Sequence, residues 1–349
     1  MTNTASPMGQ TQTTVSPPPS NTTKIQPFYS VLAKTLPPLS IRDYESIFSS
    51  LADKDDDAGL YWKEDTLSRF LEVPAEIGSI IFRSVSYLGA LPTLEGVPVP
   101  LTKEALGIAM MVYTQNVPSQ VLTSKEMGRL LFNSFAEIPP KQLDGKEKDT
   151  LQEKNISIEK EKTGYGAQIP VDTMINLISF LLSITTPSSL STSEKTIETL
   201  TPKNESISLN IAKDMVSSMQ SYVKSPSDHI PYDAFRAFLE RDAPFFFDPF
   251  VPLFSRFLYD RQKWGTAPPP EVSILALQAE KTTDLMSLPR LAQISMFLPK
   301  ERRLGTIIPL YAGSRDGFSM GMFESKVLKY PGNILCFQTS SNPQAPQCY

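Results

Sequence analysis

Apolar side chains recur at intervals of three and four residues along most of the chain, which is the spacing of an amphipathic α-helix. In the first such stretch, Ile41, Tyr44 and Phe48 fall on one helical face. The pattern predicts helices over residues 41–51, 64–71, 127–135, 207–222 and 232–239. The most apolar run, residues 174–184, is shorter than the ~18 residues that a membrane span requires, so we predict a buried helix there.

The pattern changes near residue 307. Two short apolar runs, residues 307–311 and 334–337, are bounded by Gly, Asn and Ser, which is typical of β-strands. We therefore expect an α+β protein that is mostly helical over residues 27–264 and mixed at its C-terminal end.

Four polar or proline-rich segments divide the chain. Residues 1–26 are mainly Thr, Ser, Pro and Gln, and we expect a disordered tail. Residues 139–164 and 185–206 are polar, and we expect disordered insertions within a helical domain at 27–264. Residues 265–272 include three consecutive prolines, which indicates a linker to a second domain at 273–349.

Composition narrows the functional classes. The 349 residues carry a net charge of −4 and no basic stripe, so direct nucleic-acid binding is not expected. The single histidine, His229, and the two cysteines, Cys336 and Cys348, argue against a zinc site or a disulfide framework. The N-terminus lacks the charged and apolar regions of a signal peptide. We therefore expect a soluble protein of a reducing compartment, the cytoplasm.

Residues 53–64 match the 12-residue spacing of an EF-hand calcium loop, in which carboxylate and carbonyl oxygens surround one cation. The candidate ligands are Asp53, Asp55, Asp57, Gly59, Tyr61 and Glu64. Ala58 departs from the pattern because it occupies the sixth position, where the sharp turn normally uses glycine. Two interpretations remain open: a calcium site, or a helix–loop–helix unit that has lost its metal.

A partner for this loop is suggested by the segment around Ile230. In the calcium-loop numbering Leu60 occupies the eighth position, and Ile230 is the residue predicted to pair with it. Ala234 then stands where the bidentate carboxylate belongs, so this second loop is predicted to be structural.

Residues 317–321 read Gly-Phe-Ser-Met-Gly and match the G-x-S-x-G turn of serine hydrolases. Such an enzyme needs a histidine base after the serine in the chain, and none follows Ser319. The simpler interpretation is a glycine turn followed by a helix that Ser319 caps. We therefore assign no catalytic residue.

Residues 8–13 read Met-Gly-Gln-Thr-Gln-Thr and fit the N-myristoylation signal. Gly9 can be acylated only if translation starts at Met8, because an internal glycine has no free amine. One acyl chain binds membranes only marginally, so a membrane-bound protein partner would also be needed.

Residues 310–335, which begin Leu-Tyr-Ala-Gly-Ser and end Pro-Gly-Asn-Ile-Leu, resemble the opening of a TLDc domain. Residues 62–74, 82–90 and 247–254 are similar to a narrower fungal group of TLDc proteins with a described role in telomere capping. The resemblance implies a two-sheet β-sandwich with flanking helices, of which residues 273–349 contain only the first half.

The resemblance also implies a function. TLDc proteins are non-enzymatic interaction proteins linked to oxidative-stress resistance and to regulating assembly of the vacuolar proton-pumping ATPase. For this chain it implies a cytoplasmic protein, peripheral on the vacuole membrane if Gly9 is acylated, with no cofactor except calcium. The alternatives are a calcium-sensing EF-hand adaptor and, more remotely, a hydrolase that uses Ser319.

Overall fold

A computed structural model describes most of the chain. The described residues are 22–55, 59–94, 99–136, 167–184, 202–224, 227–258, 278–279, 287–303, 306–330, 333–337 and 347–348. Among them, no helix is both long and apolar enough to cross a membrane.

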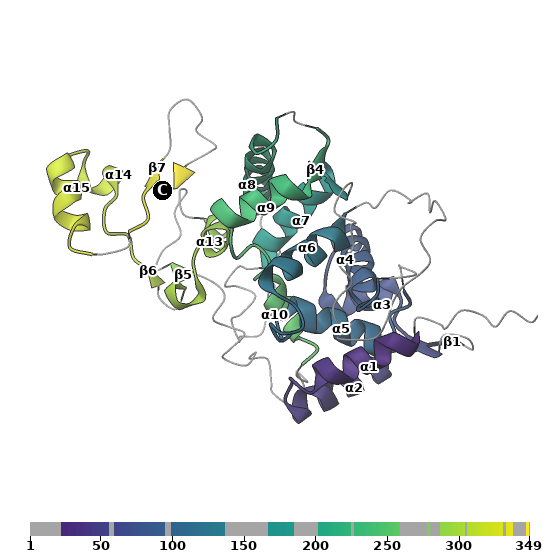
Figure 1. Ribbon diagram of the computed structural model, residues 1–349. Coiled ribbons are helices and arrows are strands. Elements are labelled where there is room, and N and C mark those ends of the chain that lie inside the picture. The colour runs from purple at the N-terminus through teal and green to yellow at the C-terminus, as the bar shows by residue number, and fades with distance from the viewer. Residues whose placement is uncertain are drawn as a thin grey trace, which may run out of the picture.

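The first part of the fold is helical. Its elements are α1 (Thr22–Ala33), α2 (Pro38–Leu51), β1 (Asp53–Asp55), β2 (Gly59–Tyr61), α3 (Glu64–Leu71), α4 (Ala75–Leu88) and α5 (Lys103–Tyr113). They are followed by α6 (Ser124–Phe135), β3 (Gln168–Pro170), α7 (Val171–Ile184), α8 (Pro202–Ser221), β4 (His229–Pro231), α9 (Tyr232–Arg241) and α10 (Phe250–Ser255). We call residues 22–258 the helical body; Figure 1 shows them gathered in one mass.

The C-terminal elements are shorter. They are β5 (Gln278–Ala279), α13 (Leu288–Ser295), the 3-10 helix η2 (Lys300–Arg302), β6 (Thr306–Ile307), α14 (Gly313–Asp316), α15 (Met320–Val327), β7 (Cys336–Phe337) and β8 (Gln347–Cys348). β5 pairs with β6 in parallel, and β7 pairs with β8 in antiparallel fashion. The two strands predicted here are thus two residues long, and the described residues form no larger sheet at this end.

The predicted helices are confirmed as α2, α3, α6, α7, α8 and α9. Their apolar faces point inward: Tyr44 and Phe48 of α2 and Leu67 of α3 are all buried. The start of α6 is also set locally, because Thr123 and Glu126 form a reciprocal capping box. The N-cap of α6 is therefore Thr123.

Four helix–loop–helix units occur in the described part of the chain: α2 with α3, α4 with α5, α6 with α7, and α8 with α9. They associate in two pairs. Trp62 bridges to Leu101 in the first pair, with the Trp62 amide donating to the Leu101 carbonyl at 3.0 Å. Ile169 of β3 lies opposite Ile230 of β4 in the second pair. Each bridging residue is fully buried, and a helix starts two residues after it.

The predicted pairing of Ile230 with Leu60 is wrong. Leu60 instead lies opposite Lys54, within a hairpin formed by β1 and β2, and Ile230 pairs with Ile169. Leu60 is largely exposed, whereas Trp62 is fully buried. The reason is burial. The Trp62 ring is larger than the Leu60 side chain and fills the core, so Trp62 is the residue that bridges to Leu101.

Two boundaries of the predicted disordered segments shift. α1 begins at Thr22, inside the expected tail, because Ile25 and Phe28 are buried in the main core. α8 begins at Pro202, inside the expected insertion that ends at residue 206. The rest of that insertion, the insertion at 139–164 and the linker at 265–272 lie outside the described residues.

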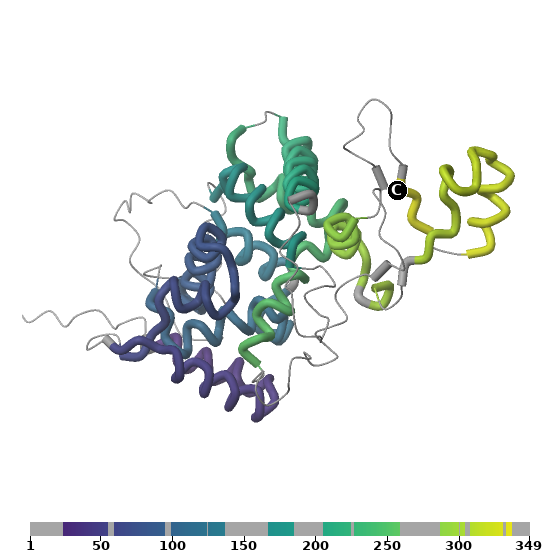
Figure 2. The backbone as a smooth tube through the Cα atoms, turned by 180° about the vertical axis from the view of Figure 1, so that it is seen from behind, coloured from purple at the N-terminus to yellow at the C-terminus, as the bar shows by residue number. Residues whose placement is uncertain are grey.

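The two views of the backbone agree on the arrangement of the C-terminal part. α14 and α15 stand away from the helical body, while α13 lies against it (Figures 1 and 2). α13 packs on α7 and α8, and Ala292 and Met296 join the core of the body. Residues 287–303 thus pack with the helical domain, although the sequence assigns them to the second domain.

Candidate functional site

The predicted calcium loop lies between α2 and α3. Asp53 and Asp55 are in β1, Gly59 and Tyr61 are in β2, and Glu64 is the first residue of α3; Asp57 lies outside the described residues. The structure therefore confirms the helix–loop–helix arrangement around these residues.

The carboxylates of this loop have other partners. Asp53 Oδ1 lies 3.3 Å from Lys63 Nζ, and this carboxylate raises the pKa of Lys63 through a hydrogen bond and its charge. Glu64 Oε1 accepts a hydrogen bond from the Ser79 hydroxyl of α4. Within the described residues, no three His, Cys, Asp or Glu side chains converge on one point. These contacts concern Asp53 and Glu64 alone, because the side chains of Asp55 and Asp57 lie outside those described.

The bridging residues define a second way of numbering these loops as calcium loops. If the bridging residue takes the eighth position of a calcium loop, the twelfth position falls four residues later. That position is Thr66, Ala105, Thr173 and Ala234 in the four units. None of these side chains is the bidentate carboxylate that calcium loops place at the twelfth position.

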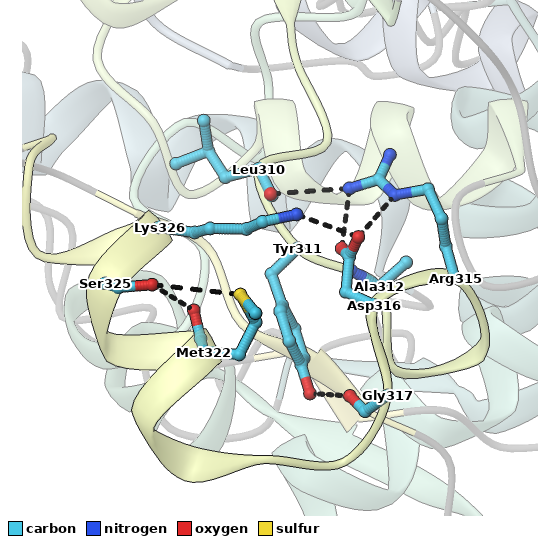
Figure 3. Close-up of polar contacts among 9 residues, drawn as sticks. All are labelled: Leu310, Tyr311, Ala312, Arg315, Asp316, Gly317, Met322, Ser325 and Lys326. Carbon is cyan, nitrogen blue, oxygen red and sulfur yellow. Dashed lines mark hydrogen bonds and ion pairs between the residues drawn. The ribbon is translucent and has the colours of Figure 1, made fainter.

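The second candidate region is the C-terminal segment, which we define as residues 306–335. Its polar groups bind one another (Figure 3). Asp316 accepts hydrogen bonds from Arg315 Nη2 at 2.7 Å, Lys326 Nζ at 2.8 Å and the Ala312 amide at 2.9 Å. These donors lower the pKa of Asp316 below its ordinary value, the Arg315 and Lys326 side chains most strongly. One carboxylate thus joins α14 to α15.

Tyr311 makes further contacts within the C-terminal segment. The Tyr311 hydroxyl donates to the Gly317 carbonyl (Figure 3). The Tyr311 ring also meets the Phe323 ring edge-on, with the ring centroids 5.3 Å apart. Gly317 has a φ of +80°, a left-handed conformation that suits glycine at this turn. Tyr311 is thus joined to the turn through Gly317 and to α15 through Phe323.

Ser319 has a structural role here. It is the N-cap of α15, and its Oγ accepts a hydrogen bond from the Met322 amide at 3.5 Å. This confirms the helix-cap interpretation of the Gly-Phe-Ser-Met-Gly sequence. The single histidine, His229, lies in β4 of the helical body, where it pairs with Pro170.

Sequence reasoning missed the apolar surface of the C-terminal segment. Phe318 is 95% exposed and Leu328 is 80% exposed. Eight of the fourteen exposed large apolar side chains of the described residues lie in this segment: Ile308, Phe318, Met320, Met322, Leu328, Tyr330, Ile334 and Leu335. The spacing of the glycines and of Ser319 revealed the turn, but nothing in the local pattern signalled that its apolar side chains lack cover.

The predicted lipidation site, Gly9, lies outside the described residues. The lipidation of the chain therefore stays a prediction from its sequence.

Comparison with curated proteins identifies similar fungal chains. The chain is 27% identical to a Colletotrichum graminicola protein named "Restriction of telomere capping protein 5", over 84% of this chain and 57% of that protein. A Sordaria macrospora protein of the same name is 27% identical over the same shares. One from Pyricularia oryzae is 28% identical over 90% of this chain and 60% of that protein. The resemblance to this fungal group, inferred from three short blocks, thus extends over most of the chain.

The chain spans well under two thirds of the curated relatives that it matches. No protein-family model matches the chain, and no solved structure matches it. The three relatives carry the same name, and this chain is similar to each of them.

Proposed function

We propose that this chain is a non-enzymatic interaction protein of the TLDc kind, and that its partner is the vacuolar proton-pumping ATPase, whose assembly it regulates. One observation carries the proposal: the C-terminal segment concentrates large exposed apolar side chains, while Asp316 is already paired with Arg315 and Lys326. Contiguous exposed apolar surface on a soluble domain marks an interaction site. The choice of partner, and a link to oxidative-stress resistance and telomere capping, rest on the resemblance.

The location follows from the same proposal. The protein is cytoplasmic and reaches the vacuole membrane through its partner, and Gly9, if acylated, adds a single weak anchor. Neither the telomere-capping link nor the pump requires the chain to bind nucleic acid, which its net charge of −4 also disfavours.

Replacing Phe318 and Leu328 together with serine is expected to weaken binding to the pump. Each is a large, exposed apolar side chain, and losing one interface hot spot costs about 2 kcal/mol, roughly a 30-fold loss of affinity. The measurement is co-sedimentation of the purified full-length protein with isolated vacuolar membranes, over a range of protein concentrations.

The matched control replaces Leu39 of α2 with serine, since Leu39 is 49% exposed but lies in the helical body. Membranes stripped of the pump serve as the second control. Equal binding by the Phe318/Leu328 variant and the wild type would refute the proposed surface, and equal binding to stripped membranes would refute the proposed partner.

A calcium-sensing adaptor is the second candidate, favoured by the helix–loop–helix unit at residues 53–64. The pairing of Asp53 with Lys63 and of Glu64 with Ser79 argues against it. We therefore expect calcium to leave the fluorescence of Trp62 unchanged. The titration uses the full-length protein with Trp264→Phe, so that Trp62 is the only tryptophan left. A saturable change in emission that Asp53→Ala abolishes would establish the sensor instead.

A further inference from the structure

Residues 287–303, which we call the strap, comprise α13, η2 and their flanks. They lie between the helical body and the C-terminal segment (Figures 1 and 2). Whatever holds the strap on the body therefore also determines where the C-terminal segment is held.

The apolar contact of the strap is modest. Its buried apolar side chains are Pro289, Leu291, Ala292, Ile294 and Met296, and α13 packs on α7 and α8. One backbone hydrogen bond is formed with the body, from the Phe245 amide to the Met296 carbonyl at 3.0 Å. By comparison, α10 is fixed in the body by stacked aromatic rings, with the Phe254 ring 4.1 Å from that of Tyr113.

A buried ion pair provides the other attachment. Arg303 Nη1 lies 2.9 Å from Asp248 Oδ2, and the two side chains are 1% and 8% exposed. The guanidinium also lies over the Phe245 ring at 5.1 Å, and its Nε donates to the Leu298 carbonyl within the strap at 2.7 Å. Asp248 is oriented by Gln115 at the end of α5, whose Nε2 donates to Oδ1 at 2.9 Å.

Some polar atoms at this contact are buried without a hydrogen-bond partner among the described residues. Arg303 Nη2 and the hydroxyl of Ser287 are buried and have no hydrogen-bond partner among the described residues. Ser287 is the N-cap residue of α13 but its side chain does not cap the helix. On the neighbouring helix, burial raises the pKa of Asp214 and Arg290 of α13 opposes that rise. Buried polar atoms without partners cost free energy, so the contact is weaker than its buried area suggests.

We propose that the strap is a releasable element, closed on α7 and α8 by the Asp248–Arg303 ion pair, and that it opens as a unit while the helical body stays folded. Opening uncovers the apolar side chains of α7 and α8 beneath α13 and frees the C-terminal segment from its fixed position. Regions with few apolar contacts open locally at a lower free energy than the core does. This proposal concerns the strap alone and does not depend on the identity of the partner.

Native-state hydrogen exchange of the full-length protein tests the proposal. Amides of α13 are expected to exchange about tenfold or more faster than those of α7, with a weaker dependence on denaturant, because a local opening exposes less surface than global unfolding. Equal protection and equal denaturant dependence in the two helices would show that the strap is part of the core, and would overturn the proposal.

Variants test the role of the ion pair. Arg303→Leu leaves Asp248 buried and uncompensated, and should accelerate exchange of α13 by about tenfold or more without changing α9. Arg302→Leu is the matched control, since the neighbouring Arg302 is exposed, and it should have no effect. The double variant Asp248→Leu/Arg303→Leu removes both charges and should restore much of the protection. Three results would overturn the proposal. The first is that Arg303→Leu leaves exchange in α13 unchanged, and the second is that it accelerates exchange in α9 as well. The third is that the double variant fails to slow exchange in α13.

Discussion

Replacing Trp62 with alanine is expected to destabilise the helical body by about 3–5 kcal/mol, the range for deleting a fully buried aromatic side chain. The Trp62 ring stacks on Phe48 at 5.9 Å and also meets Phe70 and Phe257 at 5.3 and 5.6 Å. Its indole N–H donates to the Phe48 carbonyl at 3.0 Å. The substitution therefore removes contacts with α2, α3 and the residues that follow α10, and leaves a buried carbonyl without its donor.

Urea unfolding followed by far-ultraviolet circular dichroism measures this loss. Leu60→Ala is the control, because Leu60 is 47% exposed and lies two residues before Trp62. We expect that change to cost less than about 0.5 kcal/mol, as exposed substitutions usually do. A larger loss for Leu60 than for Trp62 would mean that Leu60, as the calcium-loop numbering suggests, is the buried bridging residue.

Replacing Ile230 with alanine is expected to destabilise the body by about 2–5 kcal/mol, because its fully buried side chain would leave a cavity in the second pair. Ile230→Val should cost only about 0.5–1.5 kcal/mol, since one methyl group is removed. Urea unfolding of the full-length protein gives both values. Equal losses for the two variants would contradict the cavity explanation.

A double-mutant cycle identifies the partner of Ile230. Ile169 lies opposite Ile230, so the cycle of the two alanine variants should show a coupling of about 0.5–3 kcal/mol. The cycle of Ile230→Ala with Leu60→Ala should be additive to within about 0.5 kcal/mol, because those residues are in different pairs. Coupling of Ile230 to Leu60 and additivity with Ile169 would instead support the pairing predicted from the sequence.

The sequence alone determined that α2, α3, α6, α7, α8 and α9 are helices, but not α1, α4 or α5. Tyr44 and Phe48, one helical turn apart, mark the buried face of α2, and the run at 174–184 lies within the buried helix α7. Ser319 could be assigned to a helix cap because Gly317 supplies the turn and a helix follows. These features depend on residues within one or two turns of each other, so the local pattern contains the information.

Only the tertiary structure decided which residues meet. Trp62 pairs with Leu101, and Ile169 with Ile230, through contacts between loops that are far apart in the chain. The same is true of the docking of the strap through Arg303 and Asp248. Phe318 is exposed for a related reason, since an apolar side chain is buried only if another element covers it. Local periodicity shows which face of an element is apolar, whereas packing between distant elements determines whether that face finds a partner.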